Sequence, residues 1–103
     1  MRRWLQPYNE TPVVREMSVT VEFFGIPRER AGTAKAMVAA GTLGGALLEL
    51  GRSYPQFAES CLQSGNLAKV YVVNLNGERF VTDVDTPLHA GDAILILSAD
   101  AGG

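Results

Sequence analysis

The run from Ala93 to Leu97 is apolar at every position, and it constrains the fold more than any other segment of this chain. A strand that is apolar on both faces is typical of the centre of a sheet, covered on both sides. Its neighbours in such a sheet must come from earlier in the chain. One neighbour is predicted at 18–24, where Val19, Val21 and Phe23 alternate with polar residues.

Two hairpins are predicted to supply the remaining strands. The segment 33–39 alternates weakly and is expected to return along the first strand after a loop at 25–32. Residues 69–75 are rich in β-branched and aromatic residues, and the Asn76-Gly77 pair that follows predicts a type I′ hairpin returning through 78–81. The sequence therefore predicts a sheet of about five strands.

One main helix is predicted between the two hairpins. Thr42 can cap it and Pro55 ends it, and its apolar stripe comprises Leu43, Ala46, Leu47, Leu50 and Tyr54. The Gly44-Gly45 pair near its start is similar to an anion-binding turn, but no P-loop lysine accompanies it. Close packing of the helix on the sheet is the preferred interpretation.

The two connecting segments are rich in turn residues. The first, 56–66, predicts only a short helical turn around Phe57, Cys61 and Leu62, broken at Gly65-Asn66. In the second, 82–92, the isolated Leu88 is predicted to reach the core. The order strand, strand, helix, strand, strand, strand is the outline of an α+β β-grasp domain, a mixed sheet with one main helix packed across it.

This domain is predicted to occupy 17–98, with a flexible segment at each end. Residues 1–16 show no apolar period and are interpreted as a flexible N-terminal arm; translation that begins at Met17 is an alternative. Residues 99–103 are small or polar and are predicted to be a flexible C-terminal diglycine tail that leaves the sheet.

Charge and composition argue against several classes of partner. The net charge is −2 and no run of Lys and Arg occurs, so neither nucleic acid nor a membrane surface is expected to bind. The most apolar segment, 36–50, is interrupted by glycines and too short to span a membrane. Cys61 is the only cysteine, which fits a reducing compartment, and a cytoplasmic protein is expected.

Several segments, taken in order, resemble the MoaD/ThiS family of ubiquitin-like sulfur carriers, in particular MoaD-type small subunits of molybdopterin synthase. They are the first strand followed by Arg28-Glu29-Arg30-Ala31-Gly32, the helix start Thr42-Leu43 with its exit Tyr54-Pro55, the hairpin Val73-Asn74-Leu75-Asn76-Gly77, and the turn Thr86-Pro87-Leu88 with Gly91-Asp92. The resemblance ends on Gly102-Gly103, the last two residues.

This resemblance implies a carrier protein without catalytic residues of its own. A MoeB/ThiF-type adenylyltransferase would use ATP to adenylate the carboxylate of Gly103, and a sulfurtransferase donor would lead to the thiocarboxylate. Gly102, Ala101 and Asp100 would enter the active site of the partner, which in MoaD-type members is the large subunit of molybdopterin synthase. Glycine suits a segment that enters an active site in this way, because it lacks a Cβ atom. No bound cofactor and no metal are expected.

The pathway has alternatives. Molybdopterin (molybdenum cofactor) biosynthesis is the first expectation, but 98–101 lacks the proline found before the diglycine in many MoaD-type members. A carrier for cysteine, thiamin or other sulfur metabolites is a second reading. A third is a ubiquitin-like modifier that forms isopeptide bonds through Gly103.

Other candidate residues favour structural roles. Cys61 is expected to be a small core residue rather than an acceptor thiol, and His89 a surface loop residue. The Arg28-Glu29-Arg30 run is expected to be a solvated loop, with partner contact as the alternative. Since no Lys or Arg follows Arg79, the C-terminal end is predicted to be acidic and to suit a basic partner cleft; its carboxylates are Asp83, Asp85, Asp92, Asp100 and the terminus.

Overall fold

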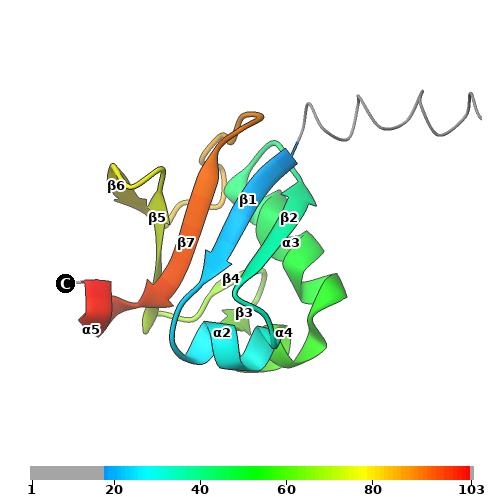
Figure 1. Cartoon of the computed structure of the whole chain (residues 1–103), viewed down its shortest axis with the longest axis vertical. Helices are drawn as coiled ribbons and strands as arrows, with labels where there is room; N and C mark the ends of the chain where they lie inside the picture. The colour runs from blue at the N-terminus through cyan, green and yellow to red at the C-terminus, as the bar shows by residue number, and fades with distance from the viewer. Residues whose placement is uncertain (1–17, 103) are drawn as a thin grey trace, which may run out of the picture.

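A five-stranded sheet organises the part of the chain that the computed structural model describes, residues 18–102 (Figure 1). Its strands are β1 (Ser18–Phe23), β2 (Lys35–Ala39), β5 (Tyr71–Leu75), β6 (Arg79–Val81) and β7 (Ala93–Ser98). Their order is β2-β1-β7-β5-β6, with β7 parallel to β1 and antiparallel to β5. The mixed β-grasp sheet is confirmed, and the apolar run lies at its centre.

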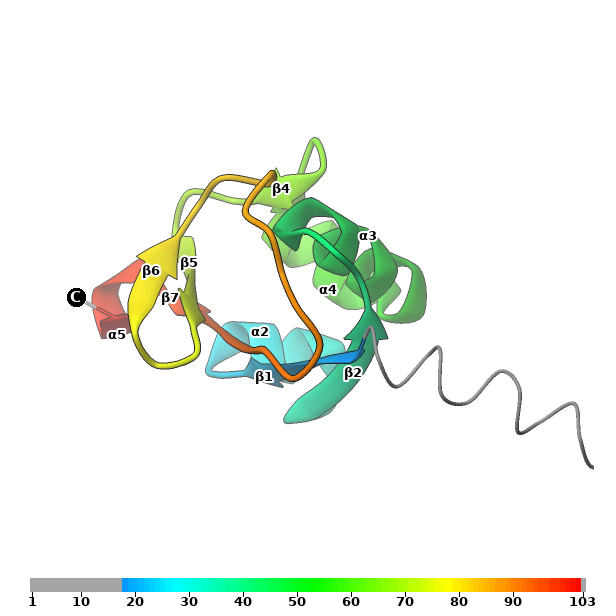
Figure 2. The same cartoon turned by 90° about the horizontal axis from the view of Figure 1, so that it is seen from above.

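The main helix, α3 (Leu43–Ser53), begins and ends as predicted. The Thr42 hydroxyl accepts a hydrogen bond from the Gly45 N–H at 3.1 Å, and the Tyr54 N–H donates to the Leu50 carbonyl at 2.8 Å. Its buried face consists of Leu43, Ala46, Leu47 and Leu50. A second helix, α4 (Pro55–Cys61), follows directly, and Figure 2 shows both on one side of the β1–β2 hairpin.

The expected loop at 25–32 contains a helix, α2 (Ile26–Ala31), so that prediction is wrong. Pro27 in the first turn is buried and supplies a helical φ, and Gly32 ends the helix at φ 77° while its N–H donates to the Arg28 carbonyl at 2.9 Å. Six residues are too few to show a helical apolar period. Only the proline and the glycine at the two ends signalled this helix.

The segment 56–66 is more ordered than expected. The helical turn predicted there is confirmed as part of α4, but the break at Gly65-Asn66 joins two short strands, β3 (Leu62–Gln63) and β4 (Asn66–Leu67). Ser64 and Gly65 both have positive φ, 51° and 84°, as a tight hairpin turn requires. This two-stranded ribbon was missed.

The core lies between the sheet and helices α3 and α4. Phe57 of α4 is fully buried and meets Phe23 edge to face at a centroid distance of 5.3 Å. Leu88 and Cys61 are buried as predicted. The two faces of β7 are covered unequally: Ile94 and Ile96 face the core, whereas on the other face Leu97 is buried and Ala93 and Leu95 are half-buried. Coverage of both faces is therefore confirmed only at the Leu97 end of the second face.

The predicted type I′ turn is confirmed, and it is tied to the start of β7. Asn76 and Gly77 have φ values of 58° and 71°, and the Glu78 N–H donates to the Leu75 carbonyl at 3.0 Å. The Asn76 amide nitrogen donates to the Asp92 carboxylate at 3.0 Å, and its amide oxygen accepts from the Ala93 N–H at 2.8 Å. These bonds join the hairpin to the connection before the last strand.

Asp92→Ala is expected to lower the free energy of unfolding by about 1 kcal/mol at neutral pH, because it removes two hydrogen-bond acceptors. The bonds from Asn76 and from the His89 N–H hold the pKa of Asp92 below its ordinary value of 3.8. A carboxylate with a lowered folded-state pKa stabilises the fold above its unfolded-state pKa, and that stability is lost as pH falls through the folded-state value.

Urea unfolding across pH checks this prediction. The difference in stability between wild type and Asp92→Ala should be full at neutral pH and shrink as pH falls below the ordinary value of 3.8. Asp85→Ala, at an exposed position of the same connection, is the matched control and should change stability little. A pH-independent difference would show that the carboxylate charge does not matter.

Candidate functional site

The C-terminal tail leaves the sheet from the end of its central strand. Ser98 pairs with Tyr71, and the Ala99 N–H donates to the Val70 carbonyl at 2.8 Å, so the chain stays bound to β5 one residue beyond the strand. Residues 99–102 then form a single helical turn, α5 (Ala99–Gly102), within the segment predicted to be a flexible tail. One isolated turn has little intrinsic stability, because helix nucleation is unfavourable.

The structure describes three of the four predicted site residues. Asp100 lies in α5 with an exposed side chain, and Ala101 and Gly102 complete the same turn. Gly103 lies outside the described residues. The structure therefore brings Asp100, Ala101 and Gly102 together beyond the sheet end, and the role of Gly103 stays a prediction.

Three apolar side chains near this exit were missed as site candidates. Phe24, Ile26 and Val70 are 55%, 50% and 62% exposed. The Phe24 N–H donates to the Ile96 carbonyl at 2.9 Å, and Ile26 and Val70 line a hollow of about 430 Å³ together with Ser98, Ala99 and Asp100. The sequence does contain one signal of this exposed surface. Phe24 is aromatic at a position where the alternation of Ser18, Thr20 and Glu22 would place a polar residue.

The acidic C-terminal end predicted from the sequence is divided in space, so that prediction is wrong for three of its carboxylates. The connection 82–92, with Asp83, Asp85 and Asp92, lies at the opposite end of β7 from the tail, beside the starts of β1 and α3 (Figure 1). At about 3.3 Å per residue, β7 separates its two ends by roughly 17 Å. Of the four aspartates in this prediction, Asp100 in α5 lies near the exit.

Cys61 cannot act as an exposed acceptor thiol. Its side chain is fully buried in the core. Burial raises the pKa of the Cys61 thiol, and the hydrogen bond from Tyr71 and the charge of Arg30 only partly oppose that effect. A buried thiol that stays protonated is a poor nucleophile, so the core role expected from the sequence is supported.

The start of α3 is occupied by protein groups. The N–H groups of Leu43 and Gly44 donate to the carbonyls of Thr86 and Val84 at 2.9 and 2.8 Å, which leaves these donors unavailable to an anion. A Cβ atom on Gly44 would lie 3.1 Å from the Val84 Cβ. The close approach predicted for Gly44-Gly45 is therefore confirmed for Gly44, but it is to the connection 82–92 rather than to the sheet.

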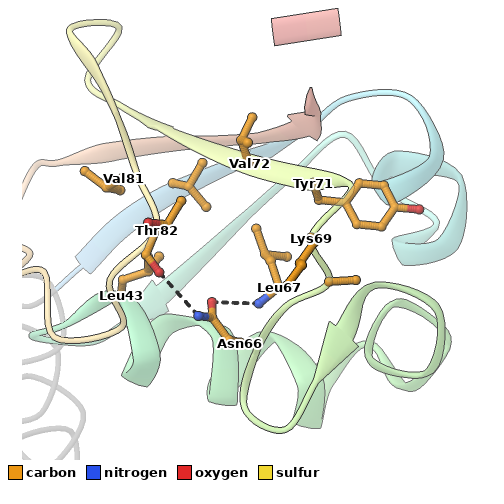
Figure 3. Close-up of a pocket in the computed structure, with 10 residues that line it drawn as sticks. Leu43, Asn66, Leu67, Lys69, Tyr71, Val72, Val81 and Thr82 are labelled. Carbon is orange, nitrogen blue, oxygen red and sulfur yellow. Dashed lines mark hydrogen bonds between the residues drawn. The ribbon is translucent and has the colours of Figure 1, made fainter. Parts of the chain in front are cut away.

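A small apolar pocket lies between the β5–β6 hairpin, β4 and the start of α3 (Figure 3). Its volume is about 200 Å³, and Leu43, Leu67 and Val81 are among the residues that line it. The Asn66 side chain at its floor is already paired, donating to the Thr82 carbonyl at 3.3 Å and accepting from the Leu67 N–H at 2.7 Å. Lys69, Tyr71 and Thr82 also line the pocket, and no hydrogen bond joins their side chains to one another.

Across residues 18–102, no three His, Cys, Asp or Glu side chains are grouped so that they could hold a metal ion. His89 is exposed, and its N–H donates to the Asp92 carboxylate at 2.8 Å within the turn. In the same range of residues, no helix is long and apolar enough to cross a membrane.

Among similar solved structures is SAMP1 from Haloferax volcanii, which is 27% identical with a TM-score of 0.69 over 84% of this chain and 99% of that one. CysO from Mycobacterium tuberculosis is 25% identical with a TM-score of 0.68, covering 79% and 98%. A chain in the complex of subunits 1 and 2 of the molybdopterin-converting factor from Helicobacter pylori is 25% identical with a TM-score of 0.57, covering 84% and 100%. No curated protein matches the sequence.

These likenesses agree with a β-grasp sheet that carries one main helix and further short ones. The ThiS family profile matches residues 21–103, which include the second half of β1, the other four strands of the main sheet and the terminal diglycine. The chain therefore belongs to the ThiS family of ubiquitin-like sulfur carriers and modifiers.

Proposed function

We propose that this protein carries sulfur as a thiocarboxylate on Gly103. A MoeB/ThiF-type partner would bind ATP, and the Gly103 carboxylate would attack the α-phosphorus and release pyrophosphate. A sulfide-level donor would then attack the acyl carbon and displace AMP, leaving the thiocarboxylate. The observation that carries the proposal is the family match through the last residue, together with a tail that leaves the open end of the central strand.

The chain contributes the acyl group and a recognition surface, while the chemistry belongs to its partners. Cys61 is buried and His89 is exposed in a turn with no nucleophile beside it, so neither is arranged for catalysis. A glycine terminus offers no Cβ atom to collide with a narrow active site. This division of labour fits a family of small carriers and modifiers.

The first acceptor pathway that we propose is molybdopterin biosynthesis, with the large subunit of molybdopterin synthase as the receiving partner. The likeness to the Helicobacter pylori molybdopterin-converting factor complex supports it. A second candidate function is protein modification through an isopeptide bond at Gly103, which the likeness to Haloferax volcanii SAMP1 favours. The likeness to CysO supports sulfur transfer to another sulfur metabolite.

Intact-mass spectrometry tests the carrier function. The protein is incubated with ATP, sulfide and the adenylating enzyme encoded in the same genome, and the expected product has gained the mass of sulfur in place of oxygen at Gly103. Omission of ATP should abolish the gain. An unchanged mass under complete conditions would contradict the proposal.

The thiocarboxylated protein can also be used to distinguish the proposed acceptor pathways. Thiocarboxylated protein mixed with the molybdopterin-synthase large subunit and its pterin precursor should form molybdopterin if the first pathway is correct. Conjugates of higher mass in cell lysate that disappear when Gly103 is removed would instead support the modifier function.

A further inference from the structure

An apolar groove of about 490 Å³ lies between α3, α4 and the β3–β4 ribbon. On α3 it is lined by Gly44, Leu47, Leu48 and Gly51, which recur at the i, i+3, i+4, i+7 spacing of one helix face. Leu47 is fully buried, whereas Leu48 is 57% exposed. Apolar pockets of about 300–1,000 Å³ are typical of ligand-binding sites.

This groove is open because α3 has a glycine where it packs against α4. A Cβ atom on Gly51 would lie 3.2 Å from the Leu62 Cδ1 atom and 3.5 Å from the Ala58 Cβ atom, so even a small side chain would begin to fill the space. All three residues line the groove. The groove therefore offers apolar walls and space for a large side chain.

Residues 1–17 lie outside the described residues, but the point where they join the sheet is close to the groove. Ser18 pairs with Ala39 at a Cα distance of about 5 Å, and Ala39 is five residues before Gly44. Ser18 is therefore within about 24 Å of Gly44, because an extended residue spans at most about 3.6 Å. The groove continues for about 12 Å from Gly44 to Arg52, since a helix rises about 1.5 Å per residue.

The largest adjacent apolar pair in residues 1–17 is Trp4-Leu5. Trp4 is fourteen residues before Ser18, so it can reach about 46 Å from the start of β1, more than the total of about 36 Å to the far end of the groove. Tryptophan buries about 150–250 Å² and is among the residues that contribute most to interfaces. The tether gives the pair an effective concentration on the order of 1 mM at the groove, so a contact of weak intrinsic affinity suffices.

Charge favours the same placement. Arg2 and Arg3 directly precede the apolar pair, and Glu59 is on α4, next in sequence to a residue of the groove wall. Glu59 is exposed, and no ion pair within residues 18–102 involves it. The cation of the groove itself, Arg52, is offset by Glu49 at 3.4 Å. A carboxylate beside the groove therefore complements two guanidinium groups beside the pair.

We propose that this groove is the intramolecular docking site of Trp4-Leu5, with Arg2 and Arg3 placed toward Glu59. The docked segment covers Leu48, which α3 otherwise exposes. Figure 2 shows α3 and α5 on opposite sides of the domain, so the docked segment leaves the exit of the tail uncovered. The inference does not depend on the carrier function.

Fluorescence of the full chain tests the docking, because Trp4 is the only tryptophan. Its emission should lie at shorter wavelength than in urea, and acrylamide should quench it less. Leu48→Glu should weaken docking at least about tenfold, since a charge would lie in an apolar groove, and should shift both values toward those in urea. Alanine at Leu48 would keep the groove apolar, so the introduced charge is the probe.

Met37→Glu is the matched control for this substitution. Met37 is 65% exposed on β2, which is the strand that pairs with the start of β1. The variant carries the same new charge as Leu48→Glu but leaves the groove intact. Its Trp4 emission and quenching should equal those of wild type.

A charge reversal tests the second part of the inference. Glu59→Lys should weaken docking at low ionic strength and have a smaller effect at high salt, because the attraction to Arg2 and Arg3 becomes a repulsion that salt screens. Glu78→Lys, exposed at the β5–β6 turn, is the control with the same change in net charge. It should leave the emission of Trp4 unchanged.

NMR of the full chain supplies a readout that does not use tryptophan emission. Trp4→Ala should shift the amide resonances of Gly51 and Leu62 and leave that of Phe80, in β6, unchanged. Emission of the folded wild type equal to that in urea, or equal effects of Leu48→Glu and Met37→Glu, would overturn the inference. A shift to shorter wavelength that grows with protein concentration would also overturn it, because the groove would then bind Trp4 of a second copy.

Discussion

Deletion of Gly103 is expected to lower the rate of adenylation at least about 100-fold while the protein stays folded. The shortened chain still ends in a glycine carboxylate, that of Gly102, so the reacting group is chemically the same. Its reach, however, falls by up to about 3.5 Å, the length of one extended residue. Misplacement of a reacting group by about 1 Å can lower a rate about 100-fold, so a whole residue exceeds what the partner can tolerate.

ATP–pyrophosphate exchange measures this effect, and circular dichroism confirms that the fold is unchanged. Gly41→Ala is a matched control, since a Cβ atom at Gly41 would meet nothing within 4 Å. It should react as wild type does. A semisynthetic protein with an amide in place of the terminal carboxylate should give no exchange at all. Normal exchange by the shortened chain would contradict the prediction, because the Gly102 carboxylate would then react despite the lost reach.

The parts of the fold that could be predicted are those in which one periodic pattern has one physical interpretation. Alternation at 18–24 predicted β1, the apolar run at 93–97 predicted the central strand, and Asn76-Gly77 predicted the type I′ turn. In each case the structure that the local sequence prefers is also the one that the packing of the whole domain requires. Such agreement allows a structure to be predicted from a local pattern.

The missed elements are short and are stabilised by their surroundings. α2 has six residues, and its signals were a proline at one end and a glycine at the other. The ribbon of β3 and β4 depends on positive φ at Ser64, which a serine rarely adopts without tertiary support. Neither element has enough apolar residues to reveal its period.

The charge around the tail could not be predicted because closeness in sequence was taken for closeness in space. Asp92 and Asp100 lie beyond opposite ends of β7, and the two ends of an extended strand are far apart in space. The cations near the tail come from α2 and from the residues before β5, which are distant in sequence. Only the strand order brings Arg30 and Lys69 to the end of β7 where the tail leaves.

Phe57→Ala is expected to destabilise the protein by about 3–5 kcal/mol, the usual range for truncation of a buried phenylalanine. Phe57 is fully buried and contacts Phe23 edge to face, so the substitution removes both buried area and an aromatic pair. The free energy of unfolding of a small domain is typically about 5–15 kcal/mol, so this loss is a large share of the total.

Thermal and urea unfolding measure the loss, with Leu48→Ala on the exposed side of α3 as the control. Leu48 is 57% exposed, and its truncation should change stability by no more than about 0.5 kcal/mol. For Phe57→Ala, each kcal/mol should lower Tm by about 4–8 °C in a domain of this size. Equal effects of the two substitutions would show that α4 does not stabilise the sheet end from which the tail leaves.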